Sequence, residues 1–218
     1  MRDASAAVET HVAHQFDDAE QQFESSSLGM WLFLAQEVLF FGGLFAAYAY
    51  YSFMYTDAFE AASNHMSLLL GGINTVVLIG SSLTMVFAVH AAQVGSKRGQ
   101  IGWLIATMVL GTVFLCIKGF EYAHKFHEGL VPGALFTYSG PDAPQHQLFL
   151  CLYFAMTGLH ALHMVIGLGI LATLVVLARR NWFGPHYYTP VEMTGLYWHF
   201  VDLVWIFLFP LLYLIGRH

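Results

Sequence analysis

Five long apolar stretches constrain this chain more than any other feature of its sequence. They run approximately over residues 28–52, 66–94, 100–124, 147–178 and 191–215. A helix of about 20 mainly apolar residues crosses the hydrocarbon core of a bilayer, and glycine and proline between the later stretches favour turns. The sequence therefore predicts an all-α polytopic membrane protein, in which residues 28–218 form one bundle of five transmembrane helices.

The composition agrees with a chain that has lipid as its main solvent. Charged residues make up 10% of the 218 residues and hydrophobic residues 57%, whereas soluble domains carry roughly 25% charged residues. Much of the net charge of -6 comes from residues 1–27, which we interpret as a polar, acidic and mobile tail without an assigned function. This charge balance disfavours nucleic acid as a partner, and no signal peptide is visible.

Basic residues are distributed unevenly between the two sides of the predicted bundle. On the N-terminal side stand Arg2, Lys97, Arg98, Arg179 and Arg180, and on the other side Lys125 and Arg217. Because basic residues are enriched in cytoplasmic loops, we expect the N-terminus in the cytoplasm and the C-terminus outside.

Small residues in the first span indicate how helices meet. Gly42 and Ala46, like Gly43 and Ala47, stand four residues apart. This pattern is typical of membrane helices whose backbones approach closely, so we expect this face to pack within a compact bundle.

Polar residues near the middle of three spans form the first candidate site. They are Glu37 in the first span, His160 and His163 in the fourth, and His199 and Asp202 in the fifth. Counting from the span ends places all five at a similar depth, where a charge costs at least about 2.5 kcal/mol and requires a partner. We expect Glu37 to be protonated or hydrogen-bonded to a histidine. The cluster is either proton-related or serves only to hold helices together.

The end of the third span carries a second group of polar residues, Glu121, His124, His127 and Glu128. These residue types could bind metal, but a di-iron bundle needs two Glu-x-x-His motifs and two further glutamates at one depth. This chain shows one such motif at a membrane edge. We therefore favour hydrogen bonding and an outer-surface contact, and we predict neither a metal site nor a catalytic residue.

Four segments carry a family resemblance: LAQEVLFFGGLFAAYAYY, GFEYAHKF, TGLHALHMVIG and YWHFVDLVWIFLFPLLYLIG. In this order they resemble subunit III of the haem-copper cytochrome c oxidases, from about Met30 to Arg217. The resemblance implies the short, five-helix bacterial form, without the first helix pair of longer members, located in the bacterial cytoplasmic membrane. It also places Glu37 on the family's membrane-embedded glutamate, and it gives the other polar residues positions but no established roles.

The resemblance implies an accessory subunit of a proton-pumping oxidase that oxidises cytochrome c and reduces oxygen to water. Such a subunit stabilises the catalytic subunit, supports proton uptake and binds phospholipid. It carries no redox centre, because haem and copper belong to partner subunits. The implied partners are subunit I as the main contact, subunit II and membrane lipids, and a larger respiratory assembly is left open.

Two alternatives to a cytochrome c oxidase subunit stay open. The same fold would serve a quinol oxidase or a nitric oxide reductase. From another class, a small proton-coupled transporter would use intramembrane acids and histidines, which are functional candidates by default. No inverted repeat in the sequence supports this last alternative.

Overall fold

The computed structural model describes residues 12–64, 66–133, 136–138, 140 and 142–215. In this part of the chain the elements are helices: α2 (Ala19–Met54), α3 (Thr56–Ser63), α4 (Leu68–Gln93), α5 (Lys97–His127), α6 (Ala143–Arg179) and α7 (Thr189–Tyr213). All except α3 are long and apolar enough to cross a membrane. Each predicted span falls on one of these five helices, so the predicted all-α membrane class is confirmed.

The first long helix starts earlier than predicted. α2 begins at Ala19 instead of near Leu28, because the Asp18 side chain caps it by accepting a hydrogen bond from the Gln21 backbone N–H at 2.8 Å. Residues 19–27 of the predicted tail are therefore the first turns of α2. Residues 1–11 of that tail lie outside the described residues.

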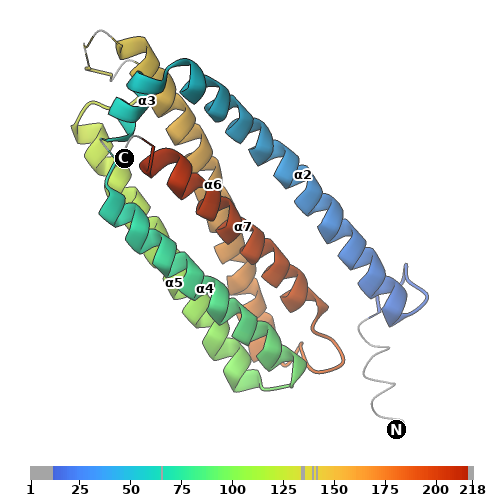
Figure 1. The fold of residues 1–218 in the computed structure, drawn as a ribbon. Coiled ribbons are helices and arrows are strands. Elements are labelled where there is room, and N and C mark those ends of the chain that lie inside the picture. Colours follow the sequence, from blue (N-terminus) through green and yellow to red (C-terminus); the bar gives the residue numbers. More distant parts are fainter. Residues whose placement is uncertain (1–11, 65, 134–135, 139, 141, 216–218) are drawn as a thin grey trace.

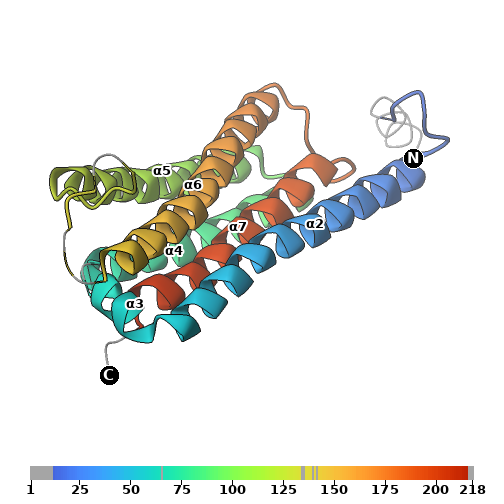
Figure 2. The same cartoon turned by 90° about the horizontal axis from the view of Figure 1, so that it is seen from above.

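The long helices form an elongated bundle in which α7 is central (Figure 1). α7 packs against α2, α4 and α6, while α5 packs against α4 and α6. Figure 2 shows α2 and α7 side by side, with α5 at the opposite side of the bundle. The first and last described residues lie at opposite ends of the bundle, as an odd number of spans requires.

Close packing around Trp198 of α7 connects four helices. A Cβ atom at Gly111 of α5 or at Gly167 of α6 would lie only 2.9 or 2.8 Å from carbons of the indole ring. The indole Nε1 donates a hydrogen bond to Ser81 Oγ of α4 at 2.8 Å. Glycine is thus required here because any side chain would occupy the space of the ring.

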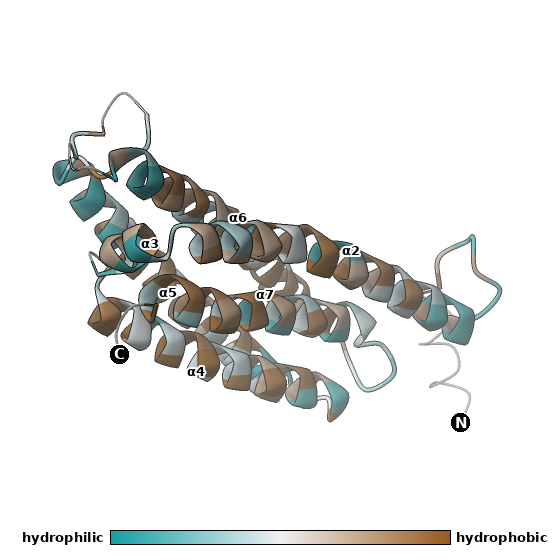
Figure 3. Ribbon diagram, turned by 45° about the horizontal axis from the view of Figure 1, so that its top comes forward, coloured by the Kyte–Doolittle hydropathy of each residue, from teal (hydrophilic) through white to brown (hydrophobic). Residues whose placement is uncertain are grey.

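The outer face of α2 differs from this close packing. In the most apolar segment of α2 only 11% of the residues are buried, whereas in the corresponding segment of α7 56% are buried. A Cβ atom at Gly42 or Gly43 would meet nothing within 4 Å. The prediction that this small-residue face packs within the chain is therefore wrong, because the face points away from the other helices. Figure 3 shows apolar residues along the central parts of the helices, α2 included, with hydrophilic residues mainly near their ends.

Candidate functional site

Glu37 of α2 faces His163 of α6. Glu37 Oε2 lies 3.2 Å from His163 Nε2, close enough for an ion pair although the two groups are not aligned as a hydrogen bond. The other ring nitrogen, Nδ1, lies 2.8 Å from the Leu159 carbonyl oxygen, which can only accept, so Nδ1 carries a proton. Nε2 is therefore the ring nitrogen that faces the Glu37 carboxyl group, and the two residues contact each other without a well-aligned hydrogen bond.

Aromatic side chains surround the Glu37–His163 pair. The Phe41 ring lies 5.4 Å from the His163 ring and 6.4 Å from the Phe200 ring, measured between centroids. The Tyr197 hydroxyl donates a hydrogen bond to the His163 carbonyl oxygen at 2.8 Å. The pair thus joins α2 to α6 in apolar surroundings, where an ionisable group needs a partner.

His160, one helical turn before His163, belongs to a different environment. Its ring is 1% exposed and lies between Phe114 and Trp205, with centroids 5.4 and 5.3 Å away. Neither ring nitrogen has a hydrogen-bond partner within the described part of the chain. His160 therefore packs as an aromatic residue in the bundle interior.

His199 and Asp202 lie where α7 meets α4. His199 Nδ1 is 2.6 Å from the Ser82 hydroxyl of α4. Asp202 is 4% exposed, and neither carboxylate oxygen has a hydrogen-bond partner among the described residues. The five residues predicted at mid-depth therefore occupy three separate places, and of them only Glu37 and His163 form a pair.

The predicted cluster at the end of α5 is divided as well. Glu121 is buried and points into the bundle, whereas His124, His127 and Glu128 are exposed. His124 Nε2 and Lys125 Nζ each lie 3.2 Å from a Glu128 carboxylate oxygen. Across the described ranges, no group of three or more histidine, cysteine, aspartate or glutamate side chains could hold a metal ion. Helical periodicity explains the division, since Glu121 lies on the inner face of α5 with Lys118.

A buried polar network centred on Lys118 was not predicted from the sequence. Lys118 Nζ donates hydrogen bonds to Glu121 Oε2 at 3.0 Å and to the hydroxyls of Tyr153 and Tyr213, both at 2.9 Å. These hydroxyls in turn donate to Glu121 Oε1 at 2.9 and 2.6 Å. The network joins α5, α6 and α7. A lysine and a glutamate three residues apart within an apolar span were the available signal.

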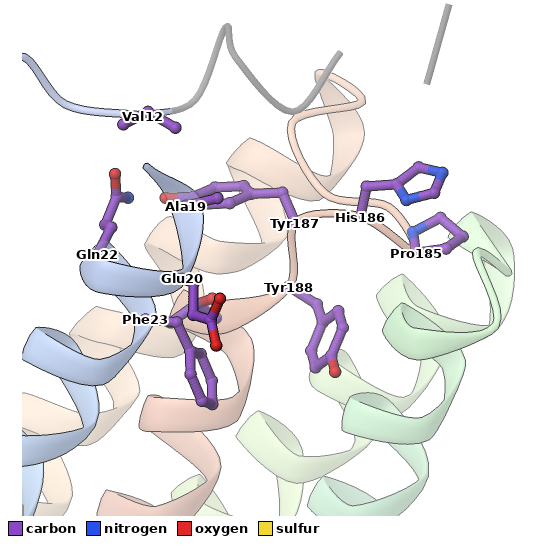
Figure 4. Close-up of a pocket in the computed structure, with 10 residues that line it drawn as sticks. Val12, Ala19, Glu20, Gln22, Phe23, Pro185, His186, Tyr187 and Tyr188 are labelled. Carbon is purple, nitrogen blue, oxygen red and sulfur yellow. The ribbon is translucent and has the colours of Figure 1, made fainter. Parts of the chain in front are cut away.

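A surface pocket of about 400 Å³ lies at the N-terminal end of α2 (Figure 4). Glu20 and Phe23 of α2 lie across it from Tyr187 and Tyr188 of the loop between α6 and α7. Burial raises the pKa of Tyr187 above its usual value. The other lining residues are Val12, Ala19, Gln22, Pro185, His186 and Thr189. Tyrosines at a helix end are typical of the membrane–water interface.

The described residues define a class: a polytopic helical membrane protein whose buried polar groups connect its helices. A family model described as cytochrome c oxidase subunit III matches residues 13–217. The chain belongs to the cytochrome c oxidase subunit III family.

Curated relatives agree with this membership. The chain is 34% identical to cytochrome c oxidase subunit 3 of Corynebacterium diphtheriae, with 87% of each chain covered. It is 32% identical to cytochrome bo(3) ubiquinol oxidase subunit 3 of Pseudomonas putida, over 87% of this chain and 85% of the relative. It is 33% identical to cytochrome c oxidase subunit 3 of Thermostichus vulcanus, with 92% of each chain covered. The predicted resemblance is thus confirmed, and a free-standing transporter is not favoured.

Proposed function

We propose that this chain is the accessory third subunit of a proton-pumping haem-copper terminal oxidase that oxidises cytochrome c and reduces oxygen to water. The observation that carries the proposal is the family match over residues 13–217, nearly the whole chain. Haem and copper belong to the partner subunits in this proposal, and the chain contributes no catalytic residue of its own.

The subunit stabilises the catalytic subunit by packing against it in the membrane. Large apolar side chains are exposed along α2, among them Leu32, Leu39 and Phe53 at 64, 78 and 90%. Surfaces of this kind suit contact with subunit I, with subunit II or with phospholipid acyl chains. The Glu37–His163 pair is the feature of this chain that would support proton uptake by the complex.

We place the N-terminus in the cytoplasm and the protein in the bacterial cytoplasmic membrane. Two basic segments, one with Lys97 and Arg98 and the other with Arg179 and Arg180, lie at the same end of the bundle as the N-terminus and support this orientation. They lie together, because Lys97 Nζ donates a hydrogen bond to the Arg179 carbonyl oxygen at 2.7 Å.

Gentle purification of the tagged chain from its native membranes tests the proposal. We expect a large multi-span subunit to accompany the chain, identified by mass spectrometry, together with a-type haem in a reduced-minus-oxidised spectrum and copper by elemental analysis. Recovery of the chain alone, without haem, from membranes that contain an active oxidase would overturn the proposal.

A quinol oxidase is the second candidate complex. Relatives named quinol oxidase subunit 3 support it, such as the protein of Bacillus spizizenii, which is 30% identical over 94% of this chain. The electron donor separates the two candidates. The purified complex should oxidise either reduced cytochrome c or a water-soluble quinol at the higher rate, and the preferred donor assigns the branch.

A further inference from the structure

The pocket at the N-terminal end of α2 combines one carboxyl group with several aromatic rings. Figure 4 shows Glu20 and Phe23 of α2 on one side of it and Tyr188 of the α6–α7 loop across from them, with Tyr187 close by. Glu20 and Phe23 are exposed, whereas both tyrosines are partly buried. The volume of about 400 Å³ lies in the range of small-molecule sites. The pocket can therefore surround a small ligand with apolar surface and one negative charge.

Hydrogen bonds hold both walls of this pocket in place. In the α6–α7 loop, Gly184 and Tyr187 exchange two backbone hydrogen bonds, at 3.1 and 3.0 Å. Before α2, the Ala13 N–H donates to Gln22 Oε1 at 2.9 Å, which ties the preceding segment back onto the helix. A pocket whose walls are already ordered loses little conformational entropy when a ligand enters it.

The charges around the pocket favour a cationic ligand. No lysine or arginine is among its ten lining residues, and the sequence has none between positions 3 and 96. In the described part of the chain Glu20 belongs to no ion pair, and Figure 4 shows that His186 points away from it. An anion at the start of α2 is disfavoured, because the Asp18 side chain already accepts the Gln21 backbone N–H.

We propose that this pocket binds an organic ammonium group. The Glu20 carboxylate supplies the counter-charge, and the rings of Phe23 and Tyr188 attract a cation through their electron-rich faces. The carbon atoms attached to the ammonium nitrogen pack against the same rings. A bare metal ion does not suit the pocket, because it would need several oxygen ligands and one carboxylate is present.

The position of the pocket gives two possible sources for the ammonium group. Glu20 precedes the apolar stretch that begins near Leu28 by eight residues, which is about 12 Å of helix. The pocket therefore lies beside the membrane surface, where both lipid headgroups and soluble amines are present. The proposal does not depend on the oxidase assignment, since the residues of this chain alone form the pocket.

Binding of three probes to the purified full chain in detergent tests the proposal. Phosphatidylethanolamine carries an ammonium group, phosphatidylglycerol with the same acyl chains lacks one, and ethanolamine is a free amine. Native mass spectrometry compares the two lipids, and calorimetry measures ethanolamine. We expect Glu20→Gln to weaken binding of the ammonium probes about two- to fivefold and to leave phosphatidylglycerol unaffected. The matched control is Glu24→Gln, an exposed acid of α2 that does not line the pocket and should not change binding.

Two substitutions of Tyr188 test the contribution of the rings. Tyr188→Leu removes the ring and should weaken ammonium binding about two- to fivefold, whereas Tyr188→Phe keeps the ring and should preserve binding. An effect of Glu20→Gln on phosphatidylethanolamine alone identifies a lipid headgroup as the ligand, and an effect on ethanolamine as well identifies a site for free amines. If neither ammonium probe depends on Glu20, or if Glu20→Gln and Glu24→Gln weaken binding equally, the proposal is wrong.

Discussion

The His163 imidazole is held between the Leu159 carbonyl oxygen, 2.8 Å from Nδ1, and the Glu37 carboxyl group, 3.2 Å from Nε2. Because Nδ1 must donate, Nε2 is the ring nitrogen that can share a proton with the Glu37 carboxyl group. We therefore predict that an apolar carbodiimide, which reacts with protonated carboxyl groups, modifies Glu37 in intact membranes. Mass spectrometry of the modified peptide measures this reaction.

Glu121 is the matched control for carbodiimide modification, since it is a buried acid of the same bundle. Its carboxylate accepts hydrogen bonds from Lys118, Tyr153 and Tyr213, so we expect it to stay unmodified. The His163→Leu variant should change the rate of Glu37 modification, because the second site for the proton has been removed. Equal modification of Glu37 and Glu121 would contradict this account of the pair.

The Lys118–Glu121 ion pair gives a prediction about stability. Either Lys118→Met or Glu121→Leu leaves a buried charge without its counter-charge, which costs about 3–5 kcal/mol. The double variant removes both charges and should recover a large part of this loss. Unfolding by titration with a denaturing detergent measures the free energies, and a double-mutant cycle gives the coupling between the two residues.

His124 provides the comparison for the Lys118 variants. Its side chain is 66% exposed and pairs with the half-exposed Glu128. Exposed pairs contribute little, so His124→Ala should change the free energy of unfolding by less than about 1 kcal/mol. Additive effects of the Lys118 and Glu121 substitutions would show that the network makes no joint contribution.

The helical spans could be predicted from the sequence because their signal is local. An apolar run of membrane-spanning length needs no knowledge of its neighbours. The short helix α3 (Thr56–Ser63) was not predicted, because its support comes from distant parts of the chain: Ser63 donates a hydrogen bond to the Leu212 carbonyl oxygen at 3.0 Å, and Phe59 packs against Phe149. Likewise, the early start of α2 depends on a single cap at Asp18.

The candidate site was predictable only in part, for a related physical reason. Similar depth in the membrane follows from counting residues, but contact also depends on how each helix is rotated and tilted. His160 and His163 are three residues apart, yet the first faces the interior and the second faces α2. Lys118 and Glu121 share one helix face, and that contact could have been predicted. Their partners Tyr153 and Tyr213 come from other helices and carry no local signal.

Substitution of His160 should change the stability of the protein in the opposite direction to substitution of Lys118. Its ring lies between Phe114 and Trp205, and its two nitrogens have no hydrogen-bond partner in the described structure. Replacing an unsatisfied buried polar group by an apolar one of similar shape is neutral or stabilising. His160→Phe or His160→Leu should therefore leave the unfolding temperature unchanged or raise it. A large decrease in both variants would indicate that His160 has a polar partner in the assembled protein.

Glycine substitutions in α6 test the packing around Trp198. A Cβ atom at Gly167 would lie 2.8 Å from the indole ring, whereas one at Gly169 on the same helix would meet nothing within 4 Å. Gly167→Ala should therefore cost about 1–3 kcal/mol through overpacking. Gly169→Ala should be neutral or stabilise the helix by up to about 1 kcal/mol, since alanine has the higher helix propensity.

The two glycine variants are compared by unfolding in the same detergent. The partner substitution Trp198→Phe removes part of the ring that Gly167→Ala would contact, so the combined variant should lose less stability than the sum of the two single changes. The Phe side chain also leaves Ser81 without the indole N–H, which makes Trp198→Phe destabilising on its own. Equal changes in the free energy of unfolding for Gly167→Ala and Gly169→Ala would contradict a stabilising close contact between α6 and Trp198 of α7.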